Sequence, residues 1–198
     1  MYKLCKTEQS ARRQRELEDG LLSAMLTKRY DEISVIDLCQ QMQIPRKSFY
    51  RYFDSKDGAL HALLDHRIMD YETQGHSERV NSFEPFYPDL PRFFHFWLEQ
   101  KPLLDALAHS GLSGLLVTHA ISLSHQKQFP DLGAGKYIHN RNYYSNALLF
   151  STCGLMSLVI QWHHDGYQQS PAEMAEITYQ LLSTPLLPRY GQQRPIFI

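Results

Sequence analysis

A proline at position 45 divides two short amphipathic segments near the N-terminus and constrains the fold of this region more than any other feature. Pro45 disfavours the helical conformation at Ile44 and suits the first turn of a following helix. The segment before the proline opens with SVID (34–37), whose Ser-x-x-acid spacing is typical of a helix N-terminus. The segment after it, PRKSFYRYF (45–53), combines three basic residues with four aromatic residues. The pattern predicts two helices joined by a tight turn, which is a helix-turn-helix.

The rest of the chain also shows the spacing of apolar residues that is typical of helices. A first helix is predicted over 7–28, although Gly20 in its interior lowers the helix propensity. The other predicted helices cover 34–42, 45–52, 56–76, 92–100, 102–110, 112–126, 142–166 and 170–183. The polar and proline-rich stretch 75–91 predicts a boundary between two parts, and 127–141 predicts a loop. We therefore expect an all-α fold of about nine helices.

Composition narrows the class of protein. Hydrophobic residues make up 43% and charged residues 21% of the chain, as in globular proteins. The formal net charge is −1, but residues 1–67 hold 12 Lys and Arg against 10 Asp and Glu, so the basic excess lies with the helix-turn-helix. A local basic surface suits contact with DNA. The three unpatterned cysteines, and the lack of an apolar leader or membrane span, predict a cytoplasmic protein that does not bind membranes.

The aromatic residues of the third helix predict which of its sides is buried. Phe49, Tyr52 and Phe53 recur at helical spacing and are expected to anchor the helix on the first one. The side chains expected on the other side are Arg46, Lys47, Ser48, Tyr50 and Arg51. Arg and Lys bind guanine edges or phosphate, and a Tyr hydroxyl donates to phosphate oxygen. The alternative is an ordinary helical hairpin with a solvated basic face, and spacing alone leaves both open.

The segment ISVIDLCQQMQIPRKSFYRYFDSKDGAL (33–60) resembles the N-terminal DNA-binding domain of the TetR family of bacterial transcriptional regulators. A looser likeness lies in SLVIQWHHDGYQQSPAEMAE (157–176), where family members have a Trp, a Gly and a Ser-Pro-capped last helix. The resemblance implies a repressor that binds a palindromic double-stranded DNA operator as a homodimer and is released by an unknown small-molecule effector. It implies a helix-turn-helix domain (1–56), a connecting helix (57–80) and a helical effector-binding and dimerisation domain (81–198).

The resemblance also implies roles for single residues of the first domain. Arg46, Lys47 and Ser48 are expected to face base edges. The residues expected at the DNA backbone are Ser34, Tyr50, Tyr52 and Lys56. The chain departs from the family at two positions: Gln43 stands where the turn commonly has Gly, and Pro45 stands where the recognition helix commonly opens with Ser. Gln43 must then either adopt a backbone conformation that favours glycine or reshape the turn.

The second half offers a candidate dimer interface and a candidate effector pocket. Helix 142–166 is apolar on nearly every side, which predicts contact both with its own core and with a partner; a central helix buried in one monomer is the alternative. The candidate interface residues are Leu155, Leu158, Val159, Met174, Ile177 and Leu181. The candidate pocket residues are Phe93, Phe96, Trp97, His119, Tyr143, Tyr144, Phe150 and Trp162, although aromatic residues at helical spacing also suit a plain core.

We expect no metal, no cofactor and no enzymatic activity. The chain has neither Cys-x-x-Cys nor His-x-x-x-His, and His61 and His66 are splayed by their spacing on a helix. Phosphate-binding glycine loops and nucleophile elbows are also missing from the sequence. Two other functions remain open: a regulator whose second half only dimerises or binds a protein, and a helical interaction module that binds no operator.

Overall fold

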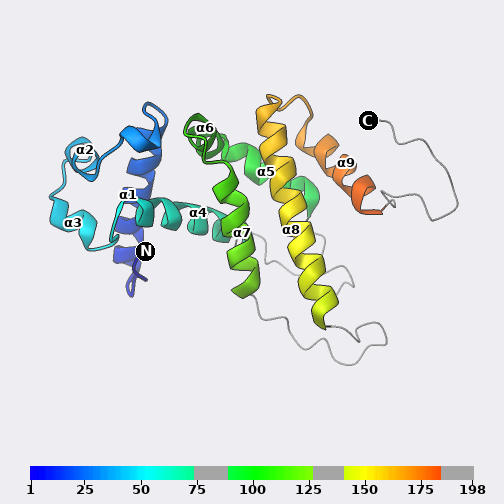
Figure 1. Cartoon of the computed structure of the whole chain (residues 1–198), viewed down its shortest axis with the longest axis horizontal. Helices are drawn as coiled ribbons and strands as arrows, with labels where there is room; N and C mark the ends of the chain where they lie inside the picture. Colours follow the sequence, from blue (N-terminus) through cyan, green and yellow to red (C-terminus); the bar gives the residue numbers. More distant parts are fainter. Residues whose placement is uncertain (74–88, 127–140, 184–198) are drawn as a thin grey trace, which may run out of the picture.

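The computed structural model describes residues 1–73, 89–126 and 141–183, and within these ranges the fold is all-helical, as predicted (Figure 1). The helices are α1 (Glu8–Met25), the one-turn 3₁₀ helix η1 (Tyr30–Glu32), α2 (Val35–Gln41), α3 (Arg46–Tyr50), α4 (Lys56–Thr73), α5 (Leu90–Glu99), α6 (Lys101–His109), α7 (Gly114–Gln126), α8 (Arg141–His164) and α9 (Pro171–Ser183). The predicted boundary at 75–91 and loop at 127–141 lie almost wholly outside the described residues.

Local side chains fix where several of these helices begin. Ser34 and Asp37 form a reciprocal capping box at the start of α2. Ser170 and Glu173 form the same arrangement at the start of α9, with Ser170 N–H donating to Glu173 Oε2 at 2.7 Å. These two predicted caps are confirmed. The start of α5 was predicted two residues too late, because the Asp89 side chain accepts from the Arg92 amide and extends the helix backwards.

Gly20 lies inside α1, and the packing of α2 explains its presence. A methyl group built at Gly20 would overlap the thioether of Met42, which follows the last turn of α2. Glycine at this position therefore leaves room for the Met42 side chain, with a lower helix propensity as the cost. This reason could not be seen in the sequence, where Gly20 appeared only as a weak point in the helix.

The turn between α2 and α3 decides between the two alternatives expected at Gln43 in favour of the strained conformation. Its φ is +53°, in the left-handed region that L-residues other than glycine rarely adopt. The turn is closed by Ile44 N–H, which donates to the Cys39 carbonyl at 2.9 Å. Pro45 is the N-cap of α3 and provides no side-chain hydrogen bond, as its departure from the family pattern suggested.

We expect Gln43→Gly to stabilise the fold by about 1 kcal/mol, because a residue with a side chain in this conformation costs about 1–2 kcal/mol and glycine gives back part of that in chain entropy. Urea denaturation followed by circular dichroism measures the change. Gln40→Gly, at an exposed position inside α2, is the matched control and is expected to destabilise by about 1 kcal/mol. Equal destabilisation by both variants would contradict this account of the turn.

Helix α4 joins the N-terminal helices to the second half, where α7 packs against α4 and α8, and α9 packs against α5 (Figure 1). One continuous apolar core runs through both halves, from Leu21 in α1 to Trp97 in α5 and Trp162 in α8. Trp162 contacts Phe94 edge-on with ring centroids 5.5 Å apart. Helix α3 lies at one end of the molecule and α9 at the other (Figure 1).

Candidate nucleic-acid interface

Two buried aromatic side chains hold α3 against the rest of the N-terminal helices. Phe49 is 1% exposed and Phe53 is fully buried, with their ring centroids 5.2 Å apart. The predicted third anchor, Tyr52, is only half-buried. Because α3 has five residues, its own backbone hydrogen bonds stabilise it little. Its position therefore depends on these tertiary contacts, which turn the opposite side of the helix outward.

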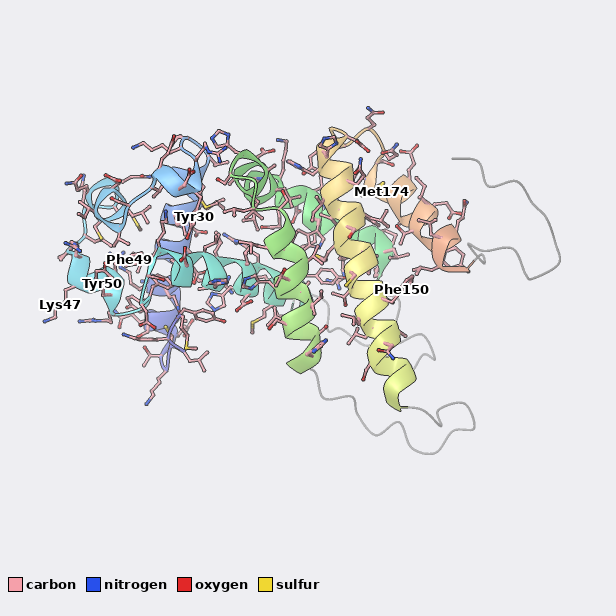
Figure 2. The ribbon with its side chains drawn as sticks, viewed as in Figure 1. Tyr30, Lys47, Phe49, Tyr50, Phe150 and Met174 are labelled. Atoms are coloured by element: carbon pink, nitrogen blue, oxygen red, sulfur yellow. The ribbon has the colours of Figure 1, made fainter. Side chains whose placement is uncertain are left out.

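The outward side of α3 carries the residues predicted to contact DNA. Arg46, Lys47, Tyr50 and Arg51 are exposed, whereas Ser48 is half-buried. The Arg46 guanidinium lies 5.9 Å from the centroid of the Tyr50 ring, so the two side chains cover one another on the surface. Figure 2 shows Lys47 at the outer edge of the molecule, with Phe49 turned toward α1. An exposed set of cations on a rigidly anchored helix has the chemistry that binds phosphates and base edges.

Ser34 is exposed at the start of α2, and its hydroxyl is already engaged within the chain. It donates to Asp37 Oδ2 at 2.6 Å and accepts from the Asp37 amide at 3.1 Å. The side-chain and backbone hydrogen bonds from Ser34 lower the pKa of Asp37. A phosphate at this site would have to share the hydroxyl with the Asp37 carboxylate.

Lys56 points into the protein rather than outward. Its ammonium donates to the carbonyls of Tyr30 and Ile33, the latter at 2.7 Å, and lies 4.1 Å from the centroid of the Tyr30 ring. These contacts tie the start of α4 to η1, a helix that the sequence did not predict. An ammonium has three N–H groups, so one donor is left for a phosphate.

A surface hollow of about 440 Å³ lies between α1 and the end of α3. Its basic lining residues are Arg12, Arg13 and Arg51, next to Tyr52. Glu16 also lines it and pairs with Arg13 at 2.6 Å, so the hollow keeps an excess of positive charge. Arg12 and Arg13 did not emerge from the sequence as candidates, because only the tertiary fold brings them to the same hollow as Arg51.

The predicted pocket residues separate into a buried cluster and others outside it. Phe93, Phe96, Trp97 and Trp162 are at most 5% exposed and belong to the core. Ring centroids of Phe96 and Trp97 are 5.5 Å apart. Phe150, in contrast, is 70% exposed on α8, so the structure does not bring it to this cluster. The side chains of Tyr143 and Tyr144 lie outside the described residues.

His119, the remaining predicted pocket residue, belongs to a polar network between the two halves of the molecule. Its Nδ1 lies 2.6 Å from Asp65 Oδ1 and its Nε2 lies 2.7 Å from His61 Nδ1. Burial alone would raise the pKa of Asp65, but hydrogen bonds from His119 and Tyr2 outweigh it and the pKa is lowered. Burial and the neighbouring His119 lower the pKa of His61.

Some of the residues predicted to form the dimer interface are buried within the chain, and others are exposed. Leu155, Val159 and Met174 are buried in the core of a single chain, and Leu158 is half-buried. Ile177 and Leu181 are each 40% exposed on α9. Only the exposed residues of the set are free to meet a partner, because the buried ones already pack within the chain.

Comparisons with known proteins bear on the fold. No protein-family model matches the chain, and no curated protein matches its sequence. The structure is similar to that of the fatty acid degradation regulator FadR from Bacillus halodurans, with a TM-score of 0.54 and 14% sequence identity. The likeness covers 94% of this chain and 100% of the other. At 14% identity, this likeness is evidence for the fold alone. Helices from both halves therefore follow an arrangement known in a solved structure.

The described ranges hold neither a cluster of metal ligands nor a membrane-spanning helix. Among these residues, no three His, Cys, Asp or Glu side chains gather closely enough to hold a metal ion. None of the described helices is long and apolar enough to cross a membrane.

Proposed function

We propose that this protein is a DNA-binding transcriptional regulator that binds a palindromic operator as a homodimer, with α3 as its recognition helix. The observation that carries the proposal is the placement of α3, whose buried Phe49 and Phe53 leave Arg46, Lys47 and Tyr50 exposed at one end of the molecule. The basic hollow beside Arg51 extends the same surface over α1. The solved structure with a similar fold is that of a regulator, which is consistent with this function.

The exposed faces of α8 and α9 support the homodimer. Phe150 on α8 is 70% exposed. On α9, Ile177 is 40% exposed and Tyr179 is 58% exposed. In the described part of the chain, a Cβ built at Gly154, one turn after Phe150, has no atom within 4 Å beyond its own stretch of helix. A glycine in the middle of a helix costs about 1 kcal/mol relative to alanine. Nothing among the described residues of one chain requires a glycine here, whereas a closely packed partner helix would.

Selection of binding duplexes from a random pool tests the function directly. We expect enrichment of a palindrome whose half-sites lie roughly one helical turn, about 34–36 Å, apart. Affinity is then measured against salt for the wild type and for Lys47→Ala with Tyr50→Phe, because contacts with phosphate make binding steeply salt-dependent. Lys47 is preferred to Lys56, whose removal would also break contacts that hold α4 to η1. Failure to enrich any duplex would favour an interaction module without an operator.

We expect Phe150→Glu combined with Ile177→Glu to weaken dimerisation by about 100-fold or more, because an unpaired charge buried at an interface costs about 3–5 kcal/mol. In a symmetric dimer each change is introduced twice. Sedimentation equilibrium measures the dissociation constant. The matched control is Leu26→Glu, which places the same charge on an exposed residue of the N-terminal half. A dimer unaffected by the double variant would exclude this face.

A small-molecule effector is supported by one buried group. Within the described part of the chain, the indole N–H of Trp97 has no hydrogen-bond partner although the side chain is 1% exposed. The indole of Trp162, in contrast, donates to the Gln169 carbonyl at 2.9 Å. Leaving a buried donor unpaired costs about 1–3 kcal/mol. A ligand with an apolar body and one acceptor would remove that cost by binding at Trp97.

Thermal melting with fatty acids of graded chain length tests this site, since the protein of similar structure is a fatty acid degradation regulator. At a ligand concentration about 100 times Kd, we expect the melting temperature to rise by about 5 °C or more. In Trp97→Phe, which keeps the ring packing but lacks the N–H, the rise is expected to be smaller. If no fatty acid of the series shifts the melting temperature, the alternative is favoured: a regulator that uses its second half only to dimerise or to bind a protein.

A further inference from the structure

The first five residues lie alongside the end of the recognition helix and the residues that follow it. Lys3 N–H donates to the Tyr52 carbonyl at 3.0 Å, and Asp54 N–H donates to the Met1 carbonyl at 3.2 Å. Tyr2 and Phe53 are the bridge partners between these bonds. We call residues 1–5 the strap. Although it is not part of any regular sheet in the described chain, it makes backbone contacts like those of an added strand.

The strap is also held on its other sides. Gln14 of α1, which is only 2% exposed, donates to the Lys3 carbonyl at 3.2 Å and accepts from the Cys5 thiol at 3.0 Å. On α4, a methyl group built at Gly58 would overlap the Met1 carbonyl. The strap is therefore packed between α1, α4 and the end of α3, with a buried amide satisfied on both of its sides.

The Tyr2 side chain continues from the strap into the polar network between the two halves. Its hydroxyl donates to Asp65 Oδ2 at 2.9 Å, and the other carboxylate oxygen accepts from His119 Nδ1 at 2.6 Å. With that proton assigned, His119 Nε2 accepts from His61 Nδ1. Burial and the hydrogen bond to Asp65 raise the pKa of Tyr2, so its hydroxyl remains a donor.

We propose that Tyr2 is a positioning residue for DNA binding, which couples the end of α3 to α7 through Asp65 and His119. The inference rests on the proposed function, because it concerns how α3 is held for DNA. A five-residue helix is placed by its tertiary contacts, and the strap contacts the carbonyls of Tyr50 and Tyr52 at its end. His119 belongs to α7, which packs on α8, so a shift of α7 would reach α3 by this route.

Operator affinity of the variant Tyr2→Phe tests the coupling. The variant keeps the backbone bonds and the edge-on contact of the ring with His66, and it removes only the hydroxyl. We expect about a 3- to 10-fold loss of affinity, which is the size of the net contribution of one ordinary intramolecular hydrogen bond. The matched control is Tyr167→Phe, whose hydroxyl is buried and has no hydrogen-bond partner in the described chain, and whose affinity is expected to be unchanged.

A double-mutant cycle separates coupling from general destabilisation. His119→Ala is expected to weaken operator binding by a similar factor, and the double variant Tyr2→Phe with His119→Ala is expected to lose little more than either single variant. Independent losses, which multiply in the double variant, would overturn the coupling. Gly58→Ala offers a second means of disturbing the strap, because alanine favours the helix yet its methyl group displaces Met1.

Amide hydrogen exchange of the free protein gives a measurement that needs no operator. If Tyr2 holds the strap, Tyr2→Phe and His119→Ala both speed exchange at Lys3 and Asp54, while Tyr167→Phe leaves it unchanged. Unchanged exchange in both variants overturns the inference. If the wild type enriches no duplex, the proposed function fails, and the exchange result still decides whether α7 is linked to the strap.

Discussion

Replacing Phe49 by alanine is expected to lower the free energy of unfolding by about 3–5 kcal/mol, the cost of removing a buried phenyl ring and leaving a cavity. Phe49 is 1% exposed and its ring packs on Phe53 and edge-on against Tyr50. Since domains are stable by only about 5–15 kcal/mol, the variant would be close to unfolding at 37 °C. Urea denaturation followed by circular dichroism measures the loss.

Ile36→Ala is the matched control for this change, because Ile36 is an apolar residue of the same helix-turn-helix but is 47% exposed. Its expected effect lies within about 0.5 kcal/mol, as for most surface substitutions. A loss below 1 kcal/mol for Phe49→Ala would mean that Phe49 does not anchor α3. The placement of the exposed cations would then lack its physical basis.

Arg46→Ala is expected to weaken binding to the selected operator by about 10- to 100-fold and to relax the sequence preference at the base pair that Arg46 contacts. A bidentate contact of arginine with guanine contributes about 1–3 kcal/mol of discrimination. Arg46 is exposed on the first turn of α3, where a major-groove helix commonly presents its base contacts. Competition between the operator and single-base variants of it measures the preference.

Arg51→Ala gives the comparison, because Arg51 carries the same charge at the other end of α3, in the basic hollow. It is expected to weaken binding to all sequences equally and to lower the slope of log affinity against log salt by about 1, as for a phosphate contact. If both variants change affinity without changing the preferred sequence, neither arginine contacts a base edge.

The sequence alone was sufficient for features that neighbouring residues decide. Capping boxes at Ser34 and Ser170 are formed by side chains three residues apart, so their spacing predicts the helix starts. The burial of Phe49 and Phe53 follows from their helical spacing for the same reason. The left-handed conformation of Gln43 was one of the two alternatives that the resemblance implied, because family members commonly have Gly at this position of the turn.

Other features depend on residues that are far apart in the sequence, and no local pattern contains them. The engagement of Lys56 by the carbonyls of Tyr30 and Ile33 depends on the packing of η1 against α4. The division of the predicted dimer set, with Val159 buried and Ile177 exposed, depends on which sides of α8 and α9 their own chain already covers. Helical periodicity identifies an apolar side but not the surface that covers it.

What the sequence by itself determined is therefore the all-helical class, most helix starts and the chemistry of α3. Only the tertiary structure decided that Tyr2 meets Asp65 and that Asp65 meets His119, across 63 and 54 residues of chain. Hydrogen bonds of this kind form where packed helices bring their partners within about 3 Å, and that distance is set by the whole core rather than by spacing along the chain.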